Sequence, residues 1–197
     1  MTIVDHKIPF DIFASWLKKA NAKSEIVEPT AMCLSTVDQN NHPSSRMVLL
    51  KKFDENGFCF FTNLTSRKGK ELAHNQHVAL CFYWGILGLQ VRIEGEVEKV
   101  SAKEADDYFM SRRRGSQIGA WASKQSCSME NDEEFAHRLT EITENFSNQD
   151  VPRPPFWSGF RVVPQKIEFW QEGEFRIHQR DLYTNSGKGW EVTKLYP

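Results

Sequence analysis

The sequence lacks an excess of charge of either sign and lacks closely spaced cysteines. Its 197 residues carry 25 Lys and Arg against 26 Asp and Glu, a formal net charge of −1. That balance argues against binding nucleic acid or an anionic membrane through bulk charge. The cysteines, Cys33, Cys59, Cys81 and Cys127, form no CxxC pair, which disfavours a disulfide framework or a zinc site and indicates a reducing compartment.

Targeting and membrane signals are also missing. The first residues, MTIVDHKIPF, lack the basic segment and apolar run of a signal peptide. No uncharged apolar stretch approaches the ~20 residues that span a bilayer. We therefore expect a cytoplasmic protein with a single domain over residues 1–197, in which residues 1–28 form an N-terminal helix region.

The common nucleotide and hydrolase motifs, GxGxxG, Walker A, GxSxG and HExxH, are absent. A bound phosphate would therefore need Arg and Lys side chains, hydroxyls and a helix N-terminus in place of a glycine-rich loop. His74 and His77 form an isolated HxxH at a predicted helix end, where we expect no metal.

Strand and turn signals dominate the chain after residue 30. The patterns predict helices over residues 9–22, 66–75, 101–113 and 131–146. They predict strands over residues 31–38, 44–53, 57–63, 77–84, 89–100, 160–170, 174–183 and 190–196, and an irregular stretch over 117–126. Within 89–100 the alternation changes phase near Gly95, which predicts a bend or bulge. Antiparallel strands with a few helices and no βαβ alternation predict a mainly β (α+β) protein, an antiparallel barrel with flanking helices.

Basic residues mark both ends of a predicted hairpin over residues 46–70. The early end carries Arg46, Lys51 and Lys52, and the late end carries Arg67, Lys68 and Lys70. The DENG turn would fold these ends back toward one anionic group. Thr62 and Ser66 add hydroxyls to the late end, which suits a phosphate. Solvated basic residues at the end of a hairpin are the alternative.

A second group consists of Tyr108, Arg112 and Ser116. Tyr108 and Arg112 are four residues apart and so share a helix face, and Ser116 follows just beyond. The three could form a second oxyanion pocket. The alternative is that the arginine run only interacts favourably with the helix dipole.

A third group is Arg176, His178 and Arg180. Alternate residues of a strand share a face, so these side chains are predicted to point the same way. They would form either a salt-bridged surface ladder or a cationic face that awaits an anionic ligand.

Seven segments, in order from about Pro29 to the C-terminus, resemble the pyridoxamine 5′-phosphate oxidase family: RMVLLK, FFTN, SRKGKEL, QIGAWASKQS, PPFWSGFRV, IEFWQ and RIHQR. The resemblance implies a homodimeric split β-barrel with FMN bound between the subunits. It also implies oxidation of pyridoxine or pyridoxamine 5′-phosphate to pyridoxal 5′-phosphate, with O₂ reduced to H₂O₂.

The same resemblance implies roles for individual residues. The FMN contacts, some of them reaching across the dimer, would be Arg46, Met47, Val48, Leu49, Leu50, Lys51, Phe61, Thr62, Arg67, Lys68, Gln90, Gln125, Ser126, Trp170 and Arg180. Within that set, Arg67 and Lys68 would hold the FMN phosphate. The clamp for the substrate phosphate would be Lys51, Tyr108, Arg112 and Ser116. The catalytic pair over the pyridine ring of the substrate would be Arg176 and His178.

Two departures from the family pattern bear on the substrate. The leading segment that covers the substrate is expected to be short or missing. The family's Ser-Arg-Pro-Arg is replaced by Ser-Arg-Arg-Arg at residues 111–114. Two other readings stay open, a flavin oxidase of phenazine-type biosynthesis and a non-catalytic flavin-binding protein. The intact phosphate clamp disfavours the first, and retention of Arg176 and His178 disfavours the second.

Overall fold

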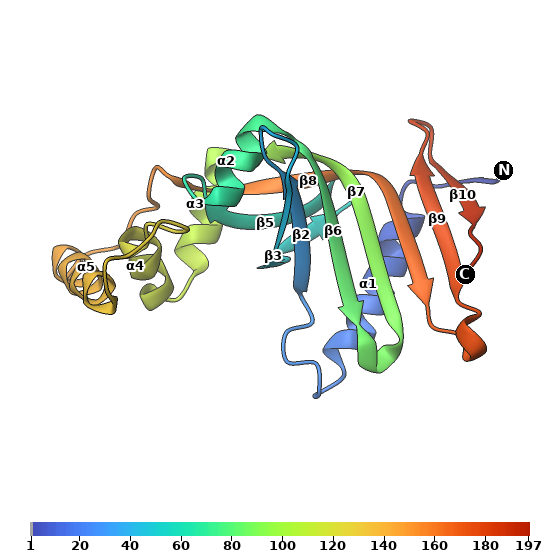
Figure 1. The fold of residues 1–197 in the computed structure, drawn as a ribbon, viewed down its shortest axis with the longest axis horizontal. Helices are drawn as coiled ribbons and strands as arrows, with labels where there is room; N and C mark the ends of the chain where they lie inside the picture. Colours follow the sequence, from blue (N-terminus) through green and yellow to red (C-terminus); the bar gives the residue numbers. More distant parts are fainter. Residues whose placement is uncertain (1) are drawn as a thin grey trace.

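The computed structural model describes residues 2–197, and within them ten strands form one antiparallel sheet flanked by helices (Figure 1). The strands are β1 Thr2–Val4, β2 Ala31–Val37, β3 Pro43–Leu49, β4 Lys52–Asp54, β5 Gly57–Asn63, β6 His77–Trp84, β7 Leu89–Lys99, β8 Trp157–Gln171, β9 Gln179–Asn185 and β10 Trp190–Lys194. The α-helices are α1 Ile8–Asn21, α2 Arg67–His74, α3 Ala102–Ser111, α4 Arg114–Ala122 and α5 Asp132–Asn145, with 3-10 turns η1 Gly85–Leu87 and η2 Glu174–Arg176.

The sheet splits along β8, its longest strand. One edge of β8 pairs with β7 along its length, while the other edge pairs first with β5 and then with β9. The register of β7 and β8 shifts between Glu94 and Gly95, so the predicted irregularity near Gly95 is confirmed. A Cβ on Gly95 would lie 2.1 Å from the carbonyl oxygen of Val163, which only glycine avoids. Within the described residues β1 and β3 are the two ends of the sheet path and do not pair with each other, so the predicted antiparallel barrel is open and split.

Helix α1 fills the concave side of this sheet with aromatic side chains. Pro9 stands in its first turn, as predicted. The fully buried ring of Phe13 meets the rings of Phe53, Phe58 and Phe82 at centroid distances of 4.8, 5.0 and 5.0 Å. Edge-to-face contacts of this kind add to the burial of apolar area that holds the helix against the strands.

Two predicted helix caps are confirmed. The Ser66 hydroxyl accepts a hydrogen bond from the backbone N–H of Gly69 at the start of α2. Ser101 and Glu104 form a capping box at the start of α3. Helices α3, α4 and α5 gather at the end of the molecule opposite β9 and β10 (Figure 1).

Three strand and loop predictions are wrong. The strand predicted over 44–53 is interrupted, because Leu50 turns into the core between β3 and β4. The stretch predicted as irregular over 117–126 is largely helix α4. The N-terminal strand β1, which pairs with β10, has no counterpart among the predicted strands.

The strand predicted over 174–183 begins only at Gln179. Phe175 and Arg176 have φ values of 54° and 65°, in the left-handed region, and belong to η2. A turn at this point removes the alternation of an extended strand, so the shared face predicted for Arg176, His178 and Arg180 is wrong. Within residues 2–197, no helix combines the length and the apolar character needed to cross a membrane.

Candidate active site

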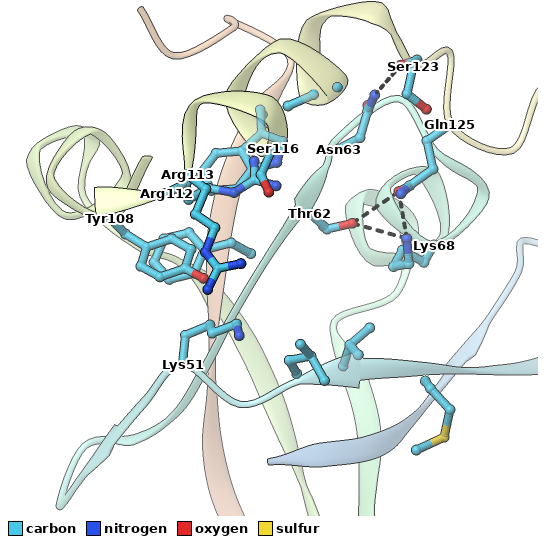
Figure 2. Close-up of a pocket in the computed structure, with 17 residues that line it drawn as sticks. Lys51, Thr62, Asn63, Lys68, Tyr108, Arg112, Arg113, Ser116, Ser123 and Gln125 are labelled. Carbon is cyan, nitrogen blue, oxygen red and sulfur yellow. Dashed lines mark hydrogen bonds between the residues drawn. The ribbon is translucent and has the colours of Figure 1, made fainter. Parts of the chain in front are cut away.

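An open cavity of about 630 Å³ lies where β3, β5, α2, α3 and α4 meet (Figure 2). Its volume is within the range of small-molecule and cofactor sites. The predicted site residues that line it are Met47, Val48, Leu49, Lys51, Phe61, Thr62, Lys68, Tyr108, Arg112, Ser116 and Gln125. The fold therefore brings the late end of the basic hairpin and the second predicted group to one cavity.

One end of the cavity is formed by Lys68 in the first turn of α2. Its buried Nζ donates to the Thr62 hydroxyl at 3.0 Å and to the side-chain oxygen of Gln125 at 2.8 Å. These partners are neutral. Burial lowers the pKa of Lys68 to about 8, with a further lowering from the charge of Arg46 and an opposing effect of Glu71. A buried ammonium with neutral partners suits an anionic ligand.

The opposite end is formed by Tyr108 and Arg112. The Tyr108 ring stacks on Phe61 at 4.0 Å between centroids, and the guanidinium of Arg112 lies 5.0 Å over the Trp157 ring. Burial raises the pKa of the Tyr108 phenol and lowers that of the Arg112 guanidinium. The phenol thus stays protonated at neutral pH and can donate a hydrogen bond.

The Arg112 guanidinium also has an unused donor. Among residues 2–197 its buried Nη1 has no hydrogen-bond partner. A buried donor without a partner is costly, and a ligand oxygen would satisfy it. Lys51, Arg113 and Ser116 surround this end, across the cavity from Thr62, Lys68 and Gln125 (Figure 2). The cavity therefore has two separate cationic ends, with apolar β3 residues between them.

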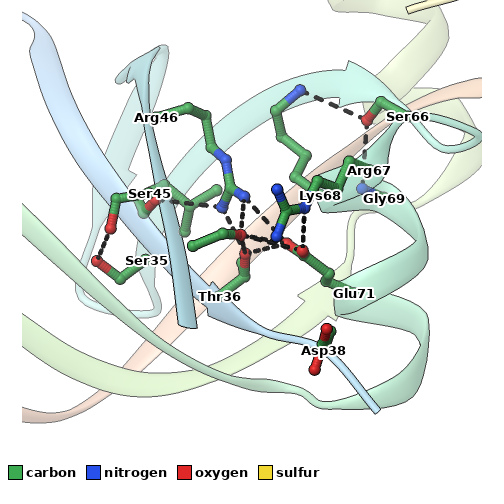
Figure 3. A network of polar contacts seen from close by, with 12 residues as sticks. Ser35, Thr36, Asp38, Ser45, Arg46, Ser66, Arg67, Lys68, Gly69 and Glu71 are labelled. Carbon is green, nitrogen blue, oxygen red and sulfur yellow. Dashed lines mark hydrogen bonds and ion pairs between the residues drawn. The ribbon is translucent and has the colours of Figure 1, made fainter. Parts of the chain in front are cut away.

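Four predicted cofactor contacts, apart from the three on β7, β8 and β9, do not line this cavity. Arg46 and Arg67 meet on the carboxylate of Glu71, beside α2 (Figure 3). Leu50 is buried in the core. Ser126, with φ of 70°, lines a smaller adjoining cavity of about 230 Å³ beyond α4.

The remaining predicted residues form a second group, here called the C-terminal group: Gln90, Trp170, Arg176, His178 and Arg180. Gln90, Trp170 and Arg180 are register neighbours on β7, β8 and β9. The His178 ring lies 4.6 Å from the Trp170 ring. Its Nδ1 accepts a hydrogen bond from the backbone N–H of Gly173 at 3.3 Å, so a neutral imidazole carries its proton on Nε2.

The C-terminal group lies away from the cavity of its own chain. Within the described residues none of its members lines that cavity. Strands β9 and β10 stand at one end of the molecule and helices α3 and α4 at the other (Figure 1). The two groups can meet only if a second chain brings its C-terminal group to this cavity.

Family models account for most of the chain. The model described as "Pyridoxamine 5'-phosphate oxidase" matches residues 19–146, and that of the "Pyridoxine 5'-phosphate oxidase C-terminal dimerisation region" matches residues 157–197. The chain belongs to the pyridoxamine 5′-phosphate oxidase family. The resemblance noted in the sequence is thereby confirmed.

Individual relatives within the pyridoxamine 5′-phosphate oxidase family span nearly the whole chain. A protein of Gluconobacter oxydans (strain 621H) named pyridoxine/pyridoxamine 5′-phosphate oxidase is 52% identical over 189 residues, 96% of this chain and 94% of its own. One of Myxococcus xanthus (strain DK1622) with the same name is 50% identical, covering 96% of this chain and 91% of its own.

Solved structures agree with the fold. PhzG from Burkholderia lata 383, in complex with tetrahydrophenazine-1-carboxylic acid, has a TM-score of 0.90 and 30% identity, with 96% of this chain and 92% of that chain covered. A pyridoxamine 5′-phosphate oxidase-related, FMN binding protein from Nostoc punctiforme PCC 73102 has a TM-score of 0.75 at 16% identity, covering 95% and 96%. The second likeness shows a shared fold.

Several residues that line this cavity were not predicted from the sequence. Gly119, Ala120 and Ser123 line it together with the predicted Ser116. Their spacing of three to four residues is that of one helix face, so recognising α4 would have revealed them. Arg113 also lines the cavity, next to Arg112 in the sequence.

Proposed function

We propose that this chain binds FMN and oxidises pyridoxine or pyridoxamine 5′-phosphate to pyridoxal 5′-phosphate, with O₂ reduced to H₂O₂. The observation that carries the proposal is the single cavity with two cationic ends, at Lys68 and at Arg112. Two phosphorylated molecules bound side by side would use both ends. The names of the relatives at 50–52% identity support the same activity.

The Lys68 end would hold the phosphate of FMN. Lys68, Thr62 and Gln125 already form a hydrogen-bonded group there, and Arg67 precedes Lys68 in the first turn of α2. Residues 47–49 of β3 and Phe61 would form the wall along the flavin ring. When bound, FMN supplies the two-electron acceptor and passes the electrons on to O₂.

The Arg112 end would hold the substrate phosphate. Arg112 offers its unpaired Nη1, Tyr108 a protonated phenol, and Lys51 and Ser116 further donors. Stacking of Arg112 on Trp157 limits how far the guanidinium can move. A phosphate held in this way would fix the position of the substrate's reactive carbon, which converts part of the binding energy into proximity.

A second copy of the chain would complete the site. The model of the C-terminal dimerisation region matches residues 157–197 and so includes every member of the C-terminal group except Gln90. Exposed apolar side chains are found at Met47 (62%) and Tyr83 (64%) on the strands and at Phe175 (91%) in η2. Faces of this kind are typical of protein contacts. We infer a homodimer in which the C-terminal group of one subunit faces the cavity of the other.

In that dimer Arg176 and His178 would lie over the substrate ring. The guanidinium of Arg176 would orient the substrate and stabilise developing negative charge. His178 presents its Nε2–H, because Nδ1 is already engaged by Gly173. It would serve either as a proton donor or as a further contact to the substrate phosphate.

The proposed partners are a phosphorylated B6 vitamer, O₂ and the second subunit. The net charge of −1 argues against nucleic acid and anionic membranes as partners. We place the reaction in the cytoplasm, because four scattered cysteines fit a reducing compartment.

A peroxide assay tests the proposal. Purified protein should be yellow, keep its flavin through gel filtration, and form H₂O₂ with pyridoxine and pyridoxamine 5′-phosphates. The unphosphorylated vitamers should have a kcat/KM lower by about 100-fold, because they leave the buried Arg112 donor unpaired. A purified protein that is colourless and does not bind added FMN would refute the proposal. Flavin binding without peroxide formation would indicate a non-catalytic flavin protein.

The similarity to PhzG favours one second candidate, a flavin oxidase acting on a tricyclic acid. Such a substrate has no phosphate for the Arg112 end. Faster oxidation of a tetrahydrophenazine acid than of the B6 phosphates, unaffected by Arg112→Ala, would support that candidate.

A further inference from the structure

Glu71 lies at the centre of a buried polar network between β2, β3 and α2 (Figure 3). Its side chain is only 5% exposed. Its carboxylate accepts hydrogen bonds from the Thr36 hydroxyl at 2.5 Å and from the Ser44 hydroxyl at 2.8 Å. It also binds the guanidinium groups of Arg46 at 3.0 Å and Arg67 at 2.8 Å. One carboxylate therefore joins two strands to the first turn of α2.

The two arginines use Glu71 differently. Both terminal nitrogens of Arg46 are engaged within the network. Nη1 donates to Leu34 O and to the Thr36 hydroxyl. Nη2 donates to the Ser44 hydroxyl and to the Glu71 carboxylate. Arg67 contacts Glu71 through Nε, and its side chain is 62% exposed. The contact thus fixes the stem of Arg67 and leaves its two terminal nitrogens for another acceptor.

The network stays ionised at all physiological pH values. Burial opposes the charge of Glu71, but hydrogen bonds from Thr36, Ser44 and Arg67, together with the charge of Arg46, lower its pKa to about 2. Burial lowers the pKa of Lys68, the charge of nearby Arg46 lowers it further, and the charge of Glu71 opposes this lowering. The repulsion between Arg46 and Lys68 is offset by this single carboxylate.

We propose that Glu71 is a positioning residue for the phosphate end of the flavin site. Its contact with Nε fixes the direction of the Arg67 side chain, and the terminal nitrogens of Arg67 would then be ready for the phosphate bound at Lys68. This inference rests on the proposed function, since it takes the phosphate of FMN as the ligand at Lys68.

Two opposing effects decide the size of this contribution. Immobilising a free arginine side chain costs roughly a factor of ten or more in affinity. The negative charge of Glu71 repels a phosphate, but the carboxylate is buried and does not line the cavity in which the phosphate would bind. Its charge is also already matched by two guanidinium groups. Loss of the anchor should therefore weaken binding more than loss of the repulsion strengthens it.

The test compares FMN with riboflavin, which lacks the phosphate, by quenching of flavin fluorescence. Glu71→Asp keeps the charge and withdraws it by one methylene, and Glu71→Gln keeps the length and removes the charge. Both variants should raise the Kd of FMN about tenfold and leave the Kd of riboflavin unchanged. At saturating FMN, the KM for the B6 phosphate should also be unchanged.

A matched control separates positioning from general loosening. Asp54→Asn breaks a comparable ion pair, with Arg161 at 2.9 Å, in a network that does not line the cavity. It should lower the Tm as the Glu71 variants do, while the ratio of FMN to riboflavin affinity stays that of the wild type. If Glu71 acts through Arg67, then Glu71→Gln should add little to Arg67→Ala in a double-mutant cycle.

Three outcomes would overturn the inference. Equal weakening of FMN and riboflavin would make Glu71 a structural residue only. FMN affinity equal to or tighter than wild type in Glu71→Asp would show that the anchor is unimportant. A wild-type chain that binds neither flavin would refute the proposed function itself, and the inference with it.

Discussion

The cavity residues and the C-terminal group are supported by the fold in opposite ways. Lys68 and Arg112 are held in the cavity wall by partners of their own chain, Lys68 by hydrogen bonds to Thr62 and Gln125 and Arg112 by the Trp157 ring. The catalytic candidate Arg176 instead stands in an exposed turn next to Phe175, which is 91% exposed. One group is preorganised within a single chain, whereas the other projects from it.

The exposed turn nevertheless has a defined shape. Left-handed backbone at Phe175 and Arg176 costs about 1–2 kcal/mol per residue, so it persists only where neighbouring contacts determine it. Those contacts include His178 N–H to Arg176 O at 3.0 Å and Gly173 N–H to the His178 ring. A Cβ on Gly173 would lie 1.9 Å from the carbonyl oxygen of Ile177, so the turn requires glycine there. Strain in an exposed turn is typical of a functional segment, and in the proposed homodimer this turn would dock on the partner.

The sharpest test of this comparison is complementation between subunits. Arg112→Ala damages the cavity and Arg176→Ala damages the C-terminal group, and each variant should lose most activity. In a heterodimer of the two, one site combines both intact groups and the other combines both damaged ones. Random pairing should therefore restore about one quarter of wild-type activity. Differently tagged subunits, unfolded and refolded together, allow the measurement.

Two controls accompany the complementation. Each variant refolded alone should stay inactive, and mixing without unfolding should restore activity only as fast as subunits exchange. No recovery from folded, FMN-containing heterodimers would mean that both groups act within one chain.

A smaller effect separates the two ends of the cavity. Arg112→Ala should raise the KM for the phosphorylated substrate by about 10- to 100-fold, because a charge-assisted contact is lost, and should leave FMN bound. Steady-state kinetics and the flavin absorbance after gel filtration measure the two quantities. Arg114→Ala is the matched control, since Arg114 binds the carbonyl groups of Phe146 and Gln149 outside the cavity. Loss of flavin from Arg112→Ala would contradict the division into two phosphate ends.

Local signals in the sequence were sufficient where short-range contacts decide the structure. Ser66 and Ser101 cap helices through residues three positions away. The phase change at Gly95 reflected a real bulge. The basic and hydroxyl residues from Thr62 to Lys68 were predicted to suit a phosphate, and Lys68 and Thr62 do meet in the cavity.

Long-range packing decided the rest. Helix α4 contains Gly115 and Gly119, which lower helix propensity, yet Ile118 packs on Phe109 and Trp157, and Gln117 donates to Phe109 O at 2.9 Å. The segment around Arg176 alternates like a strand, and only the contacts of Gly173 and His178 turn it. Arg67 and Glu71 are an i,i+4 pair visible in the sequence. That Thr36, Ser44 and Arg46 converge on the same carboxylate depends on the pairing of β2 with β3.

The smallest expected effect concerns pH and the Lys68 end alone. Lys68 has a pKa of about 8 in the unliganded chain, and a bound phosphate favours its charged form, so phosphate binding should raise that pKa. FMN should then bind most tightly below pH 8, where Lys68 is protonated. Its affinity should fall as Lys68 loses its proton, by about tenfold between pH 7 and pH 9. The charged groups that act on Lys68 are Arg46 and Glu71, and the pKa of Glu71, about 2, lies far below this range. Riboflavin affinity should stay flat, and Lys68→Met should bind FMN weakly at every pH. An unchanged FMN Kd from pH 7 to pH 9 would show that Lys68 does not contact the phosphate, leaving Arg67 as the principal cation at that end.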